Sequence, residues 1–207
     1  MYVGPFDHSI VKKAQDKGLI EIKFHNLREW GKGNYRQVDE KPFGGGAGMV
    51  LMIEPIYNCL KELKNENSLV IAMDAKGETL KQSKLNNYSK AEHIILLAGH
   101  YEGFDQRILE NLCTDVVSIG NFVLSGGEIP SMLFVDGITR LIPGALGNEE
   151  SPLSDSFYSD DQTVQYPQYT RPEAFSLADG TILKTPDVLL SGHHKEIEKW
   201  RIANSKK

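Results

Sequence analysis

The stretch "HIILLAGHYEGFD" (His93–Asp105) joins an unbroken apolar run to a loop rich in glycine and polar residues. The apolar run is far too short to cross a bilayer, and it shows no alternation between apolar and polar positions. Runs of this kind are typical of strands that are buried on both faces of a parallel sheet. The loop is then expected at the carboxyl end of its strand, where open α/β sheets bind their ligands.

Two further stretches repeat this arrangement. "LVIAM" (Leu69–Met73) is followed by "DAKGE", and "DVVSIG" (Asp115–Gly120) leads into "GNFVLSGGE". The polar segments between the runs are long enough for crossover helices. We therefore expect an α/β fold with a parallel sheet, right-handed crossovers and three glycine-rich loops at neighbouring strand ends. Glycines in such loops let the backbone approach a ligand closely, because no Cβ intervenes.

The flanking segments give simpler expectations. Residues 8–18 read as a helix with Ser9 as its N-cap and Gly18 as its end. "LIEIKFHN" (Leu19–Asn26) alternates like a strand, and the following residues up to Gly48 read as a loop. A second helix is expected to begin at Pro55, since proline suits a first helical position.

Composition and charge limit the class of protein. The chain has 207 residues, 40% of them hydrophobic, and a net charge of −5. These values are ordinary for a soluble globular domain, and the negative charge argues against purely electrostatic binding to nucleic acid. No signal peptide or membrane span is recognisable, and Cys59 and Cys113 occur in no metal-binding or disulfide spacing. We expect a cytoplasmic protein that has reduced thiols and no membrane contact.

Several common site motifs are missing from the sequence. No strand is followed by G-x-G-x-x-G, no glycine run ends in GK[ST], and no serine-centred elbow or zinc-deaminase spacing occurs. What remains is a pocket walled by three backbone loops, with the acids Glu102 and Glu128 and the aromatics Tyr101 and Phe122 nearby. This set suits a small ligand that combines an adenine with a cationic centre. S-adenosylmethionine is such a molecule.

A series of longer motifs runs in order from about Val3 to Arg201: "KPFGGGAGM", "LAGHYEGFDQR", "SIGNFVLSGGEIP", "LIPGALGNEES", "DSF", "YPQYTRPE" and "LLSGHHKEIEKWR". This series resembles the bacterial tRNA (guanine-N1)-methyltransferase family, TrmD, of the SPOUT class. The resemblance implies a parallel sheet flanked by helices, with a deep C-terminal trefoil knot that holds bent S-adenosylmethionine. It also implies a homodimer whose active site is formed between the two subunits.

The resemblance assigns cofactor-binding residues by their motif positions. They are Met73, Ala75, Gly99, Glu102, Gly103, Ile119, Gly120, Asn121, Phe122, Val123, Leu124, Gly126, Gly127 and Pro130. Glu102 receives one of two roles, an acid near the sulfonium or a ligand of the magnesium ion that the family uses. The glycines Gly44–Gly46 are expected to form a rigid turn near the substrate guanine.

The resemblance also assigns two catalytic residues. Asp155, in "DSF", matches the general base that removes the proton from N1 of guanine. Arg140 matches the arginine that stabilises negative charge arising on the base, a role that suits a permanently charged guanidinium. The implied reaction is methylation of N1 of guanosine at position 37 of tRNA, with another guanosine before it.

The implied domain organisation has three parts. Residues 1–147 form the methyltransferase domain, residues 148–170 an interdomain catalytic loop, and residues 171–207 the start of a shortened C-terminal tRNA-binding region. Family members usually have a strand before the position of Met1 and continue past the motif that ends at Arg201. Here Asn121 and Phe122 replace a commoner Asp-Tyr pair, His100 stands where Arg is also found, and Gln168 stands where His is usual.

Two alternative functions follow from these departures. One is another SPOUT RNA methyltransferase that acts on a different nucleoside. The other is a cofactor-binding remnant whose affinity for tRNA is weak because both ends are short.

Overall fold

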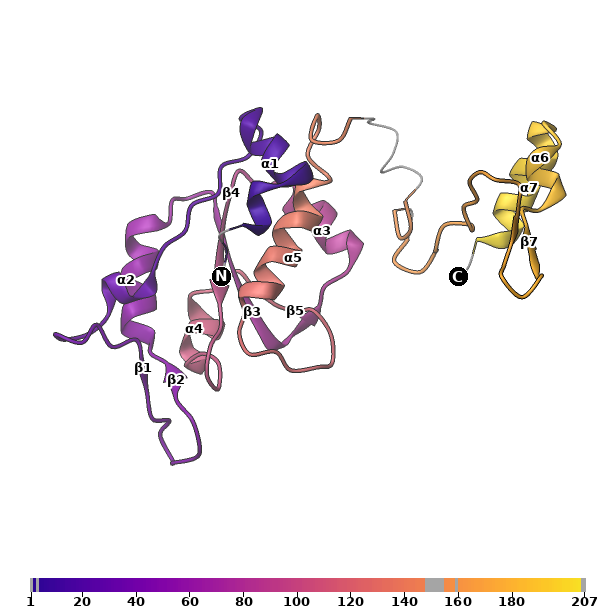
Figure 1. Cartoon of the computed structure of the whole chain (residues 1–207). Coiled ribbons are helices and arrows are strands. Elements are labelled where there is room, and N and C mark those ends of the chain that lie inside the picture. The colour runs from indigo at the N-terminus through magenta and orange to yellow at the C-terminus, as the bar shows by residue number, and fades with distance from the viewer. Residues whose placement is uncertain (1, 3, 148–154, 159, 206–207) are drawn as a thin grey trace. The chain divides into compact units, whose positions relative to one another are not determined.

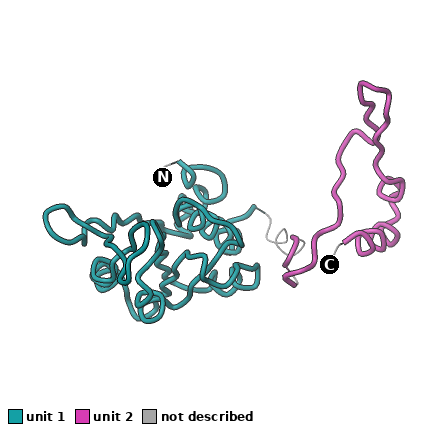
Figure 2. Tube along the Cα trace, turned by 90° about the horizontal axis from the view of Figure 1, so that it is seen from below, with its two compact units in different colours: residues 1–149 teal, residues 150–207 magenta. Residues whose placement is uncertain are grey.

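The computed structural model describes residues 2, 4–147, 155–158 and 160–205. The chain forms two compact units, Met1–Glu149 and Glu150–Lys207, which are coloured separately in Figure 2. The three-part division expected from the sequence stays a prediction. Within the described part of the chain, no helix combines the length and the apolar character that a membrane crossing requires.

The first unit is built on a parallel sheet with the strand order β4–β3–β5. Its strands are β3 (Ser68–Thr79), β4 (His93–Ala98) and β5 (Asp115–Ser118), so the three apolar runs are confirmed as parallel strands. Helices α3 (Gln82–Tyr88) and α4 (Gln106–Asn111) lie between them in sequence and make the crossovers. Figure 1 shows α2 (Ile53–Leu63) and α4 on one side of the strands, and α3 and α5 (Glu128–Thr139) on the other.

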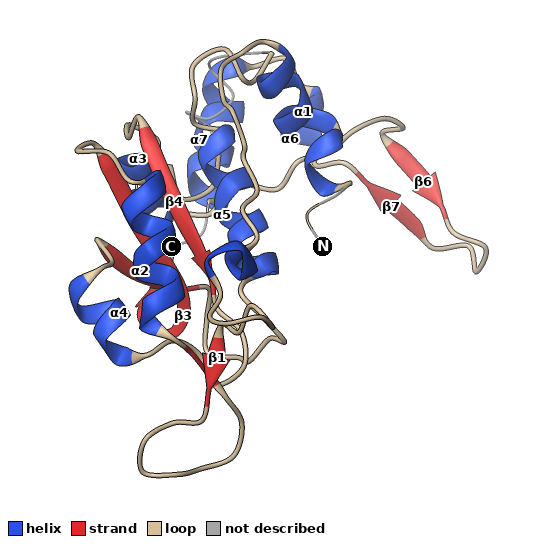
Figure 3. Ribbon diagram, turned by 90° about the vertical axis from the view of Figure 1, so that its left-hand side faces the viewer, coloured by secondary structure: helices blue, strands red, loops and turns tan. Residues whose placement is uncertain are grey.

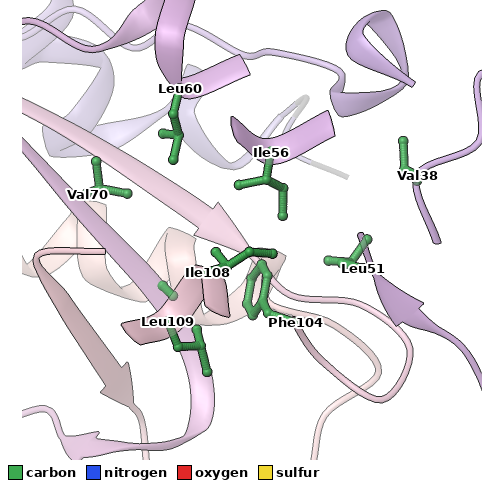
Figure 4. Packing of buried hydrophobic residues seen from close by; sticks show 9 residues of the cluster. Val38, Leu51, Ile56, Leu60, Val70, Phe104, Ile108 and Leu109 are labelled. Carbon is green, nitrogen blue, oxygen red and sulfur yellow. The ribbon is translucent and has the colours of Figure 1, made fainter. Parts of the chain in front are cut away.

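The central strand β3 supplies side chains to both cores of this unit. Val70 and Ala72 pack with residues of α2 and α4, as Figure 4 shows for Val70 beside Leu60 and Ile56. Ile71 and Met73 point to the other face, where they pack with residues of α3 and α5. Complete burial of an aliphatic side chain stabilises the fold by about 1.5–3 kcal/mol. A strand whose side chains are buried on both faces must be apolar at every position, which explains the unbroken run in the sequence.

The segment "DAKGE", expected to be a loop, instead continues β3 as far as Thr79. Pairing with β5 shifts register between Met73 and Glu78, so the strand contains an irregularity and then resumes. A Cβ added to Gly77 would lie 2.5 Å from the backbone carbonyl of Val116. The glycine that suggested a loop therefore permits close strand contact.

The N-terminal expectations were partly wrong. Helix α1 spans Ser9–Asp16 with His8 as its N-cap, so Ser9 is the first helical residue rather than the cap. Residues 19–26 form no strand; Phe24 instead stacks on the rings of Tyr2 and Phe6, with centroids 5.0 and 6.0 Å apart. Alternation alone cannot make a strand where no neighbouring strand supplies ladder hydrogen bonds.

Helix α2 begins at Ile53, two residues before the predicted start at Pro55. Pro55 lies in the first turn, where a backbone N–H has no partner within the helix and its absence costs nothing. Two short helices, η1 (Pro5–Asp7) and η2 (Leu27–Trp30), come earlier in the chain. Between η2 and α2, the strands β1 (Asp39–Glu40) and β2 (Val50–Leu51) form an antiparallel pair. The loop between β1 and β2 extends away from the sheet (Figures 1 and 3).

The second unit has its own small set of elements. Strands β6 (Ala174–Ser176) and β7 (Ile182–Lys184) form an antiparallel hairpin, followed by α6 (Asp187–Leu190) and α7 (His194–Asn204) (Figure 3). The Trp200 ring of α7 lies edge-on to Tyr169, and the Arg201 guanidinium lies 4.9 Å from the centre of the Tyr166 ring. These contacts attach α7 to the chain segment that precedes the hairpin.

A polar network lies at the start of β5, around Asp115. The hydroxyl of Tyr88 and the ammonium of Lys84 both donate hydrogen bonds to the carboxylate of Asp115, and Lys84 also pairs with Glu78 at 2.9 Å. Burial alone would raise the pKa of Asp115, but the hydrogen bonds from Tyr88 and Lys84 outweigh it and hold that pKa below its usual value.

We predict that Asp115→Asn lowers the free energy of unfolding near neutral pH by roughly 1–3 kcal/mol, because it weakens two hydrogen bonds to a charged group. A carboxyl whose pKa is depressed by folding stabilises the native state above its unfolded pKa of about 4, and this contribution is lost as pH falls through the folded pKa. Urea denaturation should therefore show a difference between variant and wild type that shrinks below about pH 3.

Asp16→Asn is the matched control, because Asp16 forms an exposed pair with Lys12. Such pairs contribute about 0–1 kcal/mol. An Asp115→Asn effect of equal size at neutral and acid pH would contradict this account of the network.

Candidate functional site

A cavity of about 250 Å³ opens at the carboxyl ends of the three parallel strands. Its walls come from the second half of β3, the loop after β4, and the end of β5 with the loop that joins it to α5. Pro130, in the first turn of α5, completes the lining. This is the place predicted from the sequence, because parallel strands bring their carboxyl-terminal loops to one edge of the sheet.

The structure brings together all but one of the residues predicted to bind the cofactor. The lining includes Met73, Ala75, Gly99, Glu102, Gly103, Ile119, Gly120, Phe122, Val123, Leu124, Gly126, Gly127 and Pro130. Asn121 is exposed and is not part of the lining. The predicted cofactor-binding set did not include six further lining residues, namely Asp74, His100, Tyr101, Val117, Ser118 and Ser125. Of these, Tyr101 was expected from the sequence to lie near the pocket. All of them except Val117 are adjacent to a predicted residue, so the motifs located the chain segments but not every residue that lines the cavity.

Two loops of the cavity meet through their backbones. The N–H of Gly127 donates a hydrogen bond of 2.7 Å to the carbonyl of Gly99. A Cβ on Gly127 would lie 2.5 Å from the nitrogen of Gly99 and 2.8 Å from the Cα of Ala98. Distances this short are prohibited for real side chains, so this position requires glycine. The adjacent glycines before α5 therefore serve close contact between two chain segments.

The loop after β5 turns immediately at its start. Gly120 has a φ of 144°, its N–H donates to the hydroxyl oxygen of Ser118 at 3.2 Å, and its carbonyl accepts from Phe122 at 3.0 Å. Only glycine adopts that backbone conformation without strain. The turn directs the following residues along the cavity and leaves the side chains of Phe122 and Val123 largely exposed.

The loop after β4 forms the opposite wall. Tyr101 has a φ of 58°, an uncommon conformation for a residue other than glycine. The loop is stabilised by a hydrogen bond of 3.0 Å from Gly103 to His100, and Glu102 donates through its backbone N–H to Met49 at 2.9 Å. Strain of this kind costs about 1–3 kcal/mol and concentrates at functional sites.

The charged groups divide between the cavity and its edge. Glu128 Oε1 lies 2.6 Å from His100 Nε2, so this carboxylate is paired and does not line the cavity. The lining acids are Glu102 and Asp74, and they give the cavity a negative character that suits a cationic group. Among the described residues, no group of three or more His, Cys, Asp or Glu side chains is arranged to hold a metal ion.

The two predicted catalytic residues belong to different compact units. Arg140 is the half-buried C-cap of α5 in the first unit and does not line the cavity. Asp155 belongs to the second unit, where its backbone carbonyl accepts a hydrogen bond of 3.3 Å from Tyr158. Their catalytic roles stay predictions.

Comparison with known proteins gives consistent results. A family model described as tRNA (Guanine-1)-methyltransferase TrmD matches residues 1–207. A tRNA (guanine-N(1)-)-methyltransferase of Staphylococcus carnosus is 48% identical over 202 residues, which are 97% of this chain and 80% of that protein. A protein of the same name from Dictyoglomus turgidum is 47% identical, and the alignment covers 97% of this chain and 79% of that protein. Another from Halalkalibacterium halodurans is 46% identical, and the alignment covers 100% of this chain and 82% of that protein. The match to the whole chain and these identities confirm what the motifs predicted: the chain belongs to the TrmD family.

Proposed function

We propose that this protein methylates N1 of a guanosine in tRNA with S-adenosylmethionine as the methyl donor. The observation that carries the proposal is the cavity, because its lining unites the family's cofactor motifs from three strand ends. Family membership across the whole chain and the names of its relatives support the reaction type. The target, guanosine 37 preceded by another guanosine, follows from the family resemblance.

The cavity suits the proposed donor in its lining and charge. S-adenosylmethionine supplies a methyl group that is already activated by its attachment to a sulfonium sulfur. Ile119, Gly120 and residues 122–124 form one wall of the cavity. We assign the backbone groups of this wall to the adenine edge. Glu102 and Asp74 offer carboxylates for the positive charge of the donor. Phe122, which stands where the family commonly has a tyrosine, contributes an apolar ring to the same wall.

The reaction requires proton removal, since N1 of a neutral guanine bears a hydrogen and is a poor nucleophile. We assign this step to the carboxylate of Asp155; a positioned general base typically accelerates a reaction about 10²–10⁴-fold. The electrons left on the base are delocalised toward O6 of guanine, where the Arg140 guanidinium stabilises the negative charge. The target base must leave its stack to reach the cavity, as in other base-modifying enzymes.

A homodimer is part of the proposal, with Asp155 of one subunit completing the cavity of the other. Support comes from apolar residues exposed on and before α5. Ile129 and Leu133 of this helix are 49% and 48% exposed, and Val123 in the preceding loop is 91% exposed. An apolar surface beside a functional cavity is typical of a protein interface. In a symmetric dimer the same surface of each subunit would meet at the two-fold axis.

The trefoil knot is also proposed. Support for it is the backbone contact between Gly99 and Gly127, since a threaded chain brings segments distant in sequence together without side chains between them. Magnesium enters only as an ion that Glu102 is expected to coordinate, and no catalytic step is assigned to it. We likewise propose that residues 148–170 form the catalytic loop and that residues 171–207 form the start of the tRNA-binding region. The proposed location is the cytoplasm, with which the free thiols of Cys59 and Cys113 are consistent.

The proposal is tested by methyl transfer from labelled S-adenosylmethionine to tRNA transcripts that carry guanosine or adenosine at position 37. We expect incorporation only into the guanosine transcript, and N1-methylguanosine in its nuclease digest. Equal incorporation into both transcripts would favour another SPOUT methyltransferase, and donor binding without any incorporation would favour a cofactor-binding remnant. In the same assay Asp155→Asn should lose turnover by about 10²-fold or more while retaining donor affinity.

We further predict that Gly127→Ala weakens S-adenosylmethionine binding at least tenfold in calorimetry. The added Cβ would separate the two loops of the cavity, and overpacking of this kind costs roughly 1–3 kcal/mol. Gly147→Ala is the matched control, because a Cβ there meets no atom within 4 Å. Wild-type affinity in Gly127→Ala would show that the Gly99–Gly127 contact does not determine the donor site.

A further inference from the structure

The loop between β1 and β2 carries an aromatic side chain that contributes nothing to the core. Phe43 has a relative exposure of 101%, the value expected for a ring surrounded by solvent. It belongs to residues 41–49, which Figures 1 and 3 show extending away from the sheet. A phenyl ring in this position gains no stabilisation from burial, so its presence points to contact with something outside the subunit.

The loop is attached at its base to a wall of the cavity. The backbone N–H of Glu102 donates to Met49 at 2.9 Å, and Leu51 donates to Gly103 at 2.9 Å. A Cβ on Gly48 would lie 2.6 Å from the Cγ of Glu102, so the loop backbone rests directly on this side chain. Glu102 and Gly103 line the cavity, and therefore the loop that carries Phe43 ends beside the proposed donor site.

The glycines around Phe43 determine how it is presented. Gly44, Gly45 and Gly46 have φ values of 84°, 80° and 129°, which glycine adopts readily and other residues do not. Gly45 donates to the carbonyl of Pro42 at 3.3 Å and closes a turn around Phe43. Because the residues that follow have no side chains, both faces of the ring remain open to a flat partner.

We propose that Phe43 stacks on an unpaired nucleobase of the tRNA, adjacent to the guanosine that is methylated. The inference rests on the proposed function and adds a substrate-positioning residue to it. A target base that leaves its stack to enter the cavity also leaves its neighbours without a stacking partner. Aromatic side chains near single-stranded RNA commonly replace that partner. An exposed ring on a loop attached to the cavity wall is placed to do so.

The test compares Phe43→Ala with Phe43→Tyr, which keeps an aromatic ring. The control is Tyr35→Ala. Tyr35 is 93% exposed, but it lies in the separate turn of residues 33–36, which is closed by a hydrogen bond of 3.1 Å from Arg36 to Gly33. Phe43→Ala should raise the KM for tRNA roughly tenfold, with the Kd for S-adenosylmethionine unchanged. Phe43→Tyr should restore the wild-type KM, and Tyr35→Ala should not alter it.

A second measurement identifies the contact as base stacking. A transcript with an abasic nucleotide beside the target guanosine should bind wild type more weakly, and the difference between wild type and Phe43→Ala should disappear on it. An unchanged KM in Phe43→Ala would overturn the stacking proposal while leaving guanosine methylation intact. Sedimentation that shows a dissociated dimer in Phe43→Ala would also overturn it, since Phe43 would then be an interface residue. Failure of the wild-type protein to methylate any transcript would instead reject the proposed function.

Discussion

The hydrogen bond between Gly127 and Gly99 brings the loop before α5 against the end of β4, and the cavity depends on this contact. No side chain fits between the two segments, because even a Cβ on Gly127 would overlap the backbone of Ala98 and Gly99. Since the contact is made by backbone atoms, the two walls are fixed relative to one another by short, rigid connections. A small ligand can then be enclosed by peptide groups, whose positions are better defined than those of long side chains.

The hydrophobic core supplies the support for this arrangement. β3 lies between two strands and is covered by helices on both faces, so its path is determined by buried side chains such as Val70 and Ile71. The strand then continues past the irregularity near Met73, and Gly77 allows it to run close to β5. The packing of the core therefore also positions the cavity, because the buried apolar strands lead directly to the residues that line it.

Much of this arrangement could be predicted from the sequence. Unbroken apolar runs identify doubly buried strands, and glycine-rich segments after them identify the ligand edge, because both signals are local. The strand expected at residues 19–26 failed since alternation does not reveal whether a neighbouring strand exists. "DAKGE" was wrongly predicted to be a loop, because the sequence alone does not distinguish a glycine that permits close contact between strands from one that permits a turn. His100 was missed, and Tyr101 was expected near the pocket but not assigned to the ligand, since the direction of a side chain depends on loop backbone angles such as the positive φ of Tyr101.

The central claim is that residues 73–75 of β3 and the loops after β4 and β5 together bind the methyl donor. A crystal structure of the protein with S-adenosylhomocysteine, the product that remains after methyl transfer, tests it most directly. The account predicts electron density for the ligand between residues 99–103 and residues 119–127, with its adenine against the backbone of the second segment. Density at another place on the protein, with this cavity empty at saturating ligand, would contradict it.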